Sequence, residues 1–110
     1  WAEALESGKA SRFGQGYNGA VWAECREMAA GFLQEAKERL PGKADGLFDE
    51  AIGHYAIVGS QLRALSELLP FEQGQEDEDV TSPEGAALVR EAAIAEREGL
   101  GTLQRLVDKI

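Results

Sequence analysis

The chain has 110 residues, of which 44% are apolar and 28% charged, a composition typical of a soluble globular domain and not of a disordered segment. A domain of this length buries roughly two-thirds of the surface that its unfolded chain exposes, which is enough for one core. The net charge of −9 disfavours nucleic acid and anionic membrane surfaces as partners, because both are bound through lysine and arginine.

Residues 1–7 are predicted to form a short helix, which Gly8 ends because glycine tolerates the left-handed backbone of a helix C-terminus. The chain begins at Trp1, inside this helix and without a capping residue, which indicates a piece of a longer protein. Residues 8–18 contain Gly14 and Gly16 and are predicted to form a loop.

A long helix is predicted from Gly19 to Leu40, where Pro41 and Gly42 end it. Its apolar side chains recur at helical spacing and most of its charged ones fall elsewhere, so we expect the apolar stripe to face the core. This stripe consists of Trp22, Cys25, Ala29, Phe32, Leu33, Ala36 and Leu40.

The most regular pattern lies in residues 44–69, where apolar side chains recur at steps of four and three without a miss. Such steps keep one stripe on one side of a helix. Between Ala51 and Gly59 the segment is apolar almost all round, which predicts neighbours on more than one side, and Pro70 ends the helix. The stripe consists of Ala44, Phe48, Ala51, Tyr55, Val58, Leu62, Leu65 and Leu69.

The last helix has a strong start signal. Ser82 is the predicted N-cap, Pro83 takes the first helical position, and Glu84 faces the positive end of the helix dipole. The acidic run of residues 76–79 lies before it and is predicted to be a solvated linker, since it lacks the spacing of a calcium-binding loop. The inner stripe of this helix is Leu88, Ala92, Ala95, Gly99, Leu103, Leu106 and Ile110.

These segments predict an all-α fold, an antiparallel helical bundle of three long helices plus one short N-terminal helix, in a single domain of residues 1–110. No period-two pattern predicts a strand. Glycines inside the helices each cost about 0.8 to 1 kcal/mol relative to alanine, so we expect close helix approach to compensate for them. They are Gly31, Gly53, Gly59, Gly99 and Gly101.

Residues 14–19 match the pattern G-x-G-x-x-G, which binds dinucleotides when it follows a strand within a βαβ unit. Here a helix and a basic loop precede it, so we interpret the segment as a flexible loop. A weaker anion site, formed by amides at the helix start with Lys9 or Arg12, stays open.

Cys25 and His54 are the only candidates for a thiol nucleophile and its base. In a hairpin around Pro41, Cys25 lies level with residue 59, about 8 Å along the axis from His54, which argues against a catalytic pair. Cys25 is therefore predicted to be a small core residue. His54 is predicted to pair with Glu50, one turn earlier, or with the last helix, and we expect neither a metal nor a cofactor.

Arg26-Glu-Met-Ala-Ala-Gly-Phe-Leu-Gln-Glu-Ala36 resembles an R-x-x-(Y/A)-A-x-F-L-x-E-A pattern in the C-terminal helical region of proteins like butirosin biosynthesis protein H. Those proteins carry a papain-like or bacteriocin-peptidase-like domain in front. The similarity continues through Ala51, Tyr55 and the last helix around residues 93–96, and a helical tryptophan such as Trp1 also fits.

The resemblance implies that the chain is an accessory helical region next to a Cys-His hydrolase or acyltransferase core. Nothing in this chain matches that core, so no catalytic residue is carried over. The resemblance implies packing and pairing roles for Arg26, Phe32, Leu33, Glu35 and Tyr55, and Glu35 stands at ion-pair spacing from Arg39.

The sequence favours a non-enzymatic interaction module that packs against a second copy of itself or a preceding domain. The alternative is a segment that shapes the substrate site of a cysteine-dependent hydrolase or acyltransferase. A small-ligand pocket near Tyr17, Cys25 and His54 is a third hypothesis. Trp1 and Leu5, expected to be partly uncovered, are candidate partner contacts together with Tyr17 and His54. A single cysteine and the absence of a secretory signal favour a cytoplasmic location.

Overall fold

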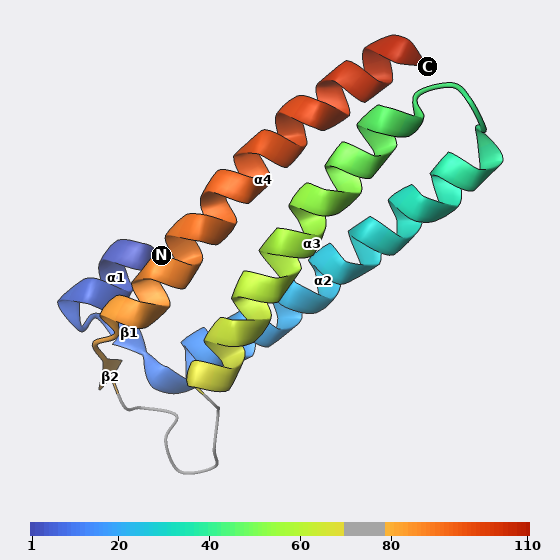
Figure 1. Ribbon diagram of the computed structural model, residues 1–110. Helices are drawn as coiled ribbons and strands as arrows, with labels where there is room; N and C mark the ends of the chain where they lie inside the picture. The colour runs from blue at the N-terminus through green and yellow to red at the C-terminus, as the bar shows by residue number, and fades with distance from the viewer. Residues whose placement is uncertain (70–78) are drawn as a thin grey trace.

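The computed structural model describes residues 1–69 and 79–110 (Figure 1). Its elements are α1 (Ala2–Ser7), β1 (Ala10–Ser11), α2 (Arg12–Arg39), α3 (Asp45–Leu68), β2 (Asp79–Val80) and α4 (Pro83–Lys109). The predicted all-α bundle of three long helices and a short first helix is confirmed. In Figure 1 the three long helices run antiparallel in chain order, with α3 between α2 and α4. The predicted acidic linker, residues 76–79, lies outside the described residues except for Asp79.

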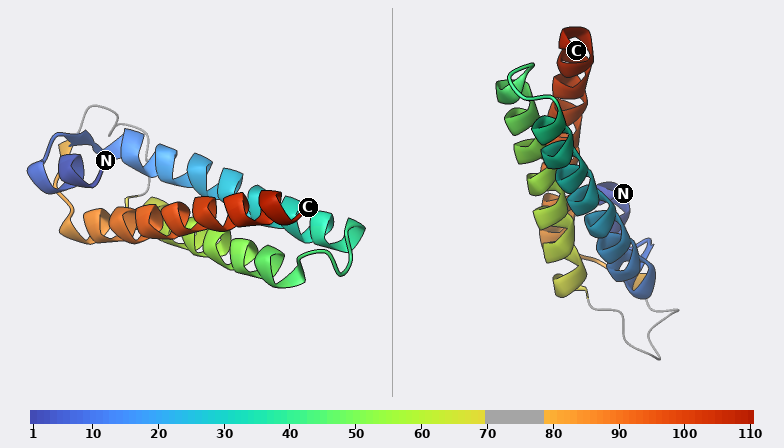
Figure 2. Two further views of the ribbon diagram at one scale, coloured as in Figure 1. Left: turned by 90° about the horizontal axis from the view of Figure 1, so that it is seen from above. Right: turned by 90° about the vertical axis from the view of Figure 1, so that its right-hand side faces the viewer.

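The bundle is elongated, with extents of 51 × 23 × 15 Å. The left view of Figure 2 shows α1 at the end of the bundle where α4 begins. Next to α1 the two-residue strands β1 and β2 pair antiparallel, with Ala10 opposite Val80. Strands this short give no period-two signal in the sequence, so they were not predicted.

Several helix ends follow the sequence signals. Gly8 and Gly42 have φ values of 74° and 76°, the left-handed geometry that glycine adopts at no steric cost. The hydroxyl of Ser82 accepts a hydrogen bond from the Gly85 amide at 2.9 Å, so Ser82 is the N-cap of α4 as predicted.

The start of α2 differs from the prediction. The helix begins at Arg12, because the Ser11 hydroxyl caps it by accepting a hydrogen bond from the Gly14 amide at 2.9 Å. The predicted loop is therefore wrong from Arg12 onward, and the G-x-G-x-x-G segment is helical. Gly16 and Gly19 are buried here. At Gly19 the glycine serves close packing and not a turn, since a Cβ atom would lie 3.1 Å from the Leu62 carbonyl oxygen.

Three apolar clusters along the bundle form the core, and α3 contributes to each. The cluster beside α1 holds Leu5, Ala10, Leu65, Leu69, Ala86 and Val89. The middle cluster holds Ala23, Val58, Leu62, Ala92 and Ala95, and the far cluster holds Leu33, Phe48, Ala51, Tyr55 and Leu106. The predicted stripe of α3 is thus buried, with only Ala44 half-buried. Leu5, expected to be partly uncovered, is fully buried because α1 packs onto α4.

Two other predictions hold only in part. α3 has neighbours on two sides, but Ile57 in its apolar middle is half exposed, so one face of the helix stays free. In α4 the predicted residues Ala92, Ala95, Gly99 and Leu106 are buried, Leu88 and Leu103 are half-buried, and Ile110 is exposed.

The prediction that helices approach closely at the glycines inside them is correct at Gly59 and Gly99. A Cβ atom at Gly59 would lie 3.6 Å from the Ala23 carbonyl oxygen, and one at Gly99 would lie 3.3 Å from Cβ of His54. At Gly31, Gly53 and Gly101 a Cβ atom would meet nothing within 4 Å, so the prediction of close approach is wrong there.

Candidate functional site

The apolar stripe predicted to be the inner face of α2 lies mostly at the surface. Phe32 is 69% exposed, Trp22 is 45% exposed, and Cys25 is exposed as well, so the prediction of a core cysteine is wrong. Of the predicted stripe only Leu33 is buried. The reason lies in the small residues of α2, since Gly19 and Ala23 allow α3 to approach closely and thereby turn the stripe outward.

A groove adjoins this stripe, between α2 and α4 and with α3 as its floor. Its central part encloses about 450 Å³. The central lining residues are Arg26, Ala29, Phe32, Leu33, Tyr55, Glu96 and Leu103. Toward α1 the groove continues past Trp1, Trp22 and Leu62. Both tryptophans of the chain therefore line it. Near Phe32 a separate pocket is lined by α2 and its C-cap Leu40, without α3 or α4.

One ion pair crosses the groove. Nη2 of Arg26 lies 2.6 Å from Oε1 of Glu96, and Nε of Arg26 donates a hydrogen bond to the same oxygen at 2.8 Å. The Arg26 guanidinium also lies 4.9 Å from the ring centre of Trp22, within the range of a cation–π contact. This pair joins α2 to α4 and holds the indole of Trp22 against the groove wall.

The resemblance implies packing or pairing roles for five residues, and the structure shows such contacts for all of them except Phe32. Arg26 is paired as described, and Glu35 pairs with Arg39 at 2.9 Å. Leu33 and Tyr55 are buried, whereas Phe32 is exposed and does not pack in the core.

The predicted contact residues do not converge on one site. Tyr17 is half exposed and stacks on Phe13, with ring centres 6.2 Å apart. Cys25 is level with Gly59, as predicted, because Gly59 lies against Ala23 and Glu27 on either side of it. His54 instead turns toward α4, so Cys25 and His54 face different neighbours. The groove is lined by none of Tyr17, Cys25 and His54.

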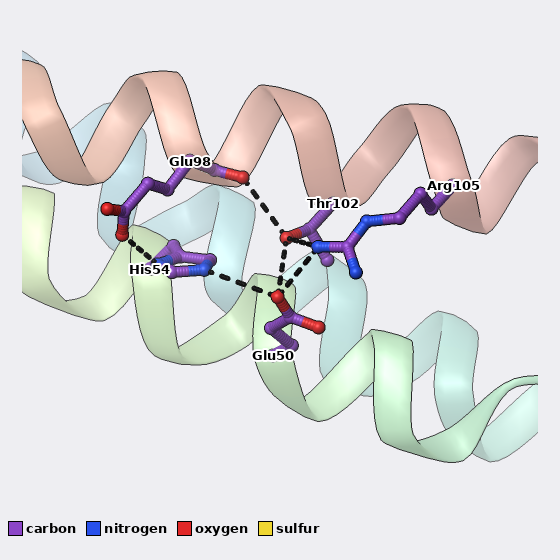
Figure 3. A network of polar contacts seen from close by, with 5 residues as sticks. All are labelled: Glu50, His54, Glu98, Thr102 and Arg105. Atoms are coloured by element: carbon purple, nitrogen blue, oxygen red, sulfur yellow. Dashed lines mark hydrogen bonds and ion pairs between the residues drawn. The ribbon is translucent and has the colours of Figure 1, made fainter.

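A second polar cluster lies between α3 and α4 (Figure 3). Glu50 Oε1 accepts hydrogen bonds from Arg105 Nη2 at 2.7 Å and from the Thr102 hydroxyl at 3.2 Å. His54 lies between two carboxylates, with Nε2 at 3.8 Å from Glu50 and Nδ1 at 3.5 Å from Glu98. The sequence predicted Glu50 or the last helix as the partner of His54, and His54 lies near carboxylates of both. The hydrogen bonds of Glu50 with Thr102 and Arg105 join α3 to α4.

Sequence reasoning missed Thr102 and Arg105. Thr102 is fully buried on the inner stripe of α4, between Gly99 and Leu106. A polar residue at helical spacing from buried ones could have indicated a buried hydrogen bond, because buried hydroxyls are nearly always paired.

This cluster makes the stability of the fold depend on pH. The hydrogen bond from Arg105 lowers the pKa of Glu50 below its ordinary value of 4.5, while partial desolvation opposes the shift. A carboxylate with a lowered pKa stabilises the fold above its unfolded pKa, and this contribution is lost as the pH falls through the folded pKa. Below about pH 4.5 the wild type should therefore lose more thermal stability than Glu50→Gln. Circular dichroism melts from about pH 7 to about pH 3 measure the difference.

Arg105→Gln is the matched control, since it removes the donor and should abolish the same pH dependence. If the melting temperatures of the wild type and Glu50→Gln differ by the same amount at every pH, the role assigned to Glu50 is contradicted.

No family model, no curated protein and no solved structure matches this chain. The resemblance to the helical region of proteins like butirosin biosynthesis protein H therefore stays a prediction. Within residues 1–69 and 79–110, no three histidine, cysteine or acidic side chains are grouped so as to hold a metal ion. No helix in that part of the chain has an apolar stretch long enough to cross a membrane.

Proposed function

We propose that the chain is a non-catalytic interaction module that receives an amphipathic helix along α2. The observation that carries the proposal is the exposure of the α2 stripe. A contiguous exposed apolar patch marks an interaction site more often than scattered apolar residues do. Here the exposed Trp22 and Phe32 and the half-buried Ala29 lie along one wall of a groove, beside Arg26.

The arrangement of the helices supports a helical partner. α3 packs along both α2 and α4, so the three long helices take three corners of a four-helix arrangement. At one end of the bundle α1 packs on α4, with Leu5 against Ala86 and Val89. Beyond α1 no helix of residues 1–69 and 79–110 covers the groove, and a helix laid there would lie over the Arg26–Glu96 ion pair with apolar side chains on both sides.

The α4 wall of the groove is also apolar. Glu96 and Leu103 line the groove, and helical spacing puts Leu100 and Val107 on the same side of α4. Leu100 and Val107 are 57% and 65% exposed. An amphipathic helix that lays its apolar face into an apolar groove is a recurrent mode of recognition.

The test uses the two tryptophans as reporters. A designed amphipathic helical peptide of leucine and lysine, titrated into the protein, should shift the tryptophan emission because Trp1 and Trp22 line the groove. Phe32→Glu should weaken binding on the order of tenfold or more.

Two controls make this test specific. Ile94→Glu adds the same charge at an exposed apolar residue on the opposite side of α4, so it should bind like the wild type. A second peptide has the same leucine and lysine content in a scrambled order, so it has no apolar face. Its binding measures only the attraction to the net charge of −9. Equal binding of both peptides, or of both variants, would contradict the proposal.

A further inference from the structure

We infer that the partner is a short amphipathic helix that lies antiparallel to α2 and α4, with its last turn beside Trp1 and its last carbonyl groups bound by Arg97. This inference rests on the proposed function and adds the direction and length of the partner helix. Three observations on the walls of one groove carry it: the course of α1, the dipoles of α2 and α4, and the surroundings of Arg97.

α1 already occupies the start of the fourth corner of the bundle. Leu5 belongs to the same apolar cluster as Val89 of α4. Trp1, four residues earlier, lines a pocket with Glu96, seven residues further along α4. α1 is therefore antiparallel to α4, and its first residues lie toward the open part of the groove (Figure 2). A partner helix that follows the same course has its last turn next to Trp1.

The dipoles of α2 and α4 favour the same direction. These helices have 28 and 27 residues and are parallel to each other, since both begin at the α1 end of the bundle (Figure 1). Aligned peptide dipoles make the N-terminus of a long helix positive and its C-terminus negative. An antiparallel helix between α2 and α4 has opposite partial charges beside both of its ends, whereas a parallel helix would have like charges there.

Arg97 supplies a positive charge at the place where such a helix ends. A pocket of about 600 Å³ lies between the start of α1 and α4, and Arg90 and Arg97 both line it. Arg90 is paired with Glu6. Glu3 lines the pocket as well, but neither Glu3 nor any other carboxylate in the described part of the chain forms an ion pair with Arg97. The last four carbonyl groups of a helix have no partner within it, and a nearby arginine binds them favourably.

The open part of the groove has room for about three helical turns. Glu96, beside Trp1, and Val107, near the end of α4, are separated by about 17 Å along the helix. At the Trp1 end α1 closes the groove, so the partner helix ends there.

Energy transfer from tryptophan tests the direction. A leucine–lysine peptide of about 14 residues carries a dansyl group on a lysine of its first or its last turn, positions about 15 Å apart in a helix. Trp1 and Trp22 both line the α1 end of the groove, so the label in the last turn should quench the tryptophan emission more strongly. Equal quenching, or the reverse order, would overturn the direction and leave the proposed function standing.

Val107→Trp gives the matched control for the position of the reporter. It is made together with Trp1→Phe and Trp22→Phe, so that the tryptophan lies at the other end of the groove. The label in the first turn should then quench more strongly. The same order of quenching in both proteins would overturn the inference. If the dansyl anisotropy shows that neither peptide binds the wild type, the proposed function is overturned as well.

Arg97→Gln tests the role of the guanidinium. Relative to Arg63→Gln, it should weaken binding of the peptide about twofold to fivefold, the range of an exposed ionic contact. Arg63→Gln is the matched control because it changes the net charge equally at a residue that pairs with Glu27, outside the groove. In a parallel arrangement Arg97 would face the positive end of the partner helix, and its removal would strengthen binding. Equal or tighter binding by Arg97→Gln would therefore overturn the inference.

Discussion

Phe48→Ala is expected to lower the free energy of unfolding by about 3–5 kcal/mol, the largest effect expected of a single truncation among residues 1–69 and 79–110. Phe48 is 1% exposed and leads the fully buried side chains in volume. It fills the space between Leu33, Tyr55 and Leu106, which come from three different helices. Removing the ring leaves a cavity that those helices cannot close without losing their other contacts.

Urea unfolding followed by circular dichroism measures the loss, with Phe32→Ala as the matched control because it makes the same substitution at an exposed site. Phe32→Ala should cost less than about 1 kcal/mol. If Phe48→Ala does not fold, the free energy of unfolding is measured for Phe48→Leu instead, which leaves a smaller cavity. Equal losses at the two sites would contradict the packing described here.

Gly19→Ala is expected to destabilise the fold by about 1–3 kcal/mol although alanine is the better helix former. A Cβ atom at Gly19 would lie 3.1 Å from the Leu62 carbonyl oxygen and 3.3 Å from the Ser66 amide nitrogen. Both are backbone atoms of α3, so neither can move without shifting the helix. The contact between α2 and α3 would have to widen at this point.

Gly31→Ala is the control in the same helix. A Cβ atom there meets nothing within 4 Å, so the substitution should raise stability by about 0.8–1 kcal/mol. The midpoints of thermal and urea unfolding of Gly19→Ala and Gly31→Ala should therefore shift in opposite directions relative to the wild type. Changes of the same sign would mean that α2 and α3 do not approach each other most closely around Gly19.

The sequence predicts α3 well and α2 poorly, for one physical reason. α3 has neighbours on two sides, and its large apolar residues, such as Phe48 and Leu65, are the ones those neighbours bury. In α2 the small residues Gly19 and Ala23 decide which side meets α3. Periodicity indicates which stripe is apolar but not which partner covers it, so Trp22 and Phe32 were assigned to the wrong surroundings.

The polar cluster between α3 and α4 was likewise predictable only in part. The spacing of Glu50 and His54 is local, and the sequence predicts their pairing. The hydrogen bonds of Glu50 with Thr102 and Arg105 depend on how far α4 is shifted along α3, which local spacing does not determine. The groove between α2 and α4 depends on the separation of two helices and was not predictable either.

The central claim is that the exposed stripe of α2 is a surface that binds an amphipathic helix. Hydroxyl-radical footprinting of Trp22 tests it most directly, by comparing the protein with and without a saturating concentration of the leucine–lysine peptide. The peptide should protect Trp22 in the wild type and in Ile94→Glu, and should leave it reactive in Phe32→Glu. Equal reactivity of Trp22 in the wild type with and without the peptide would contradict the account.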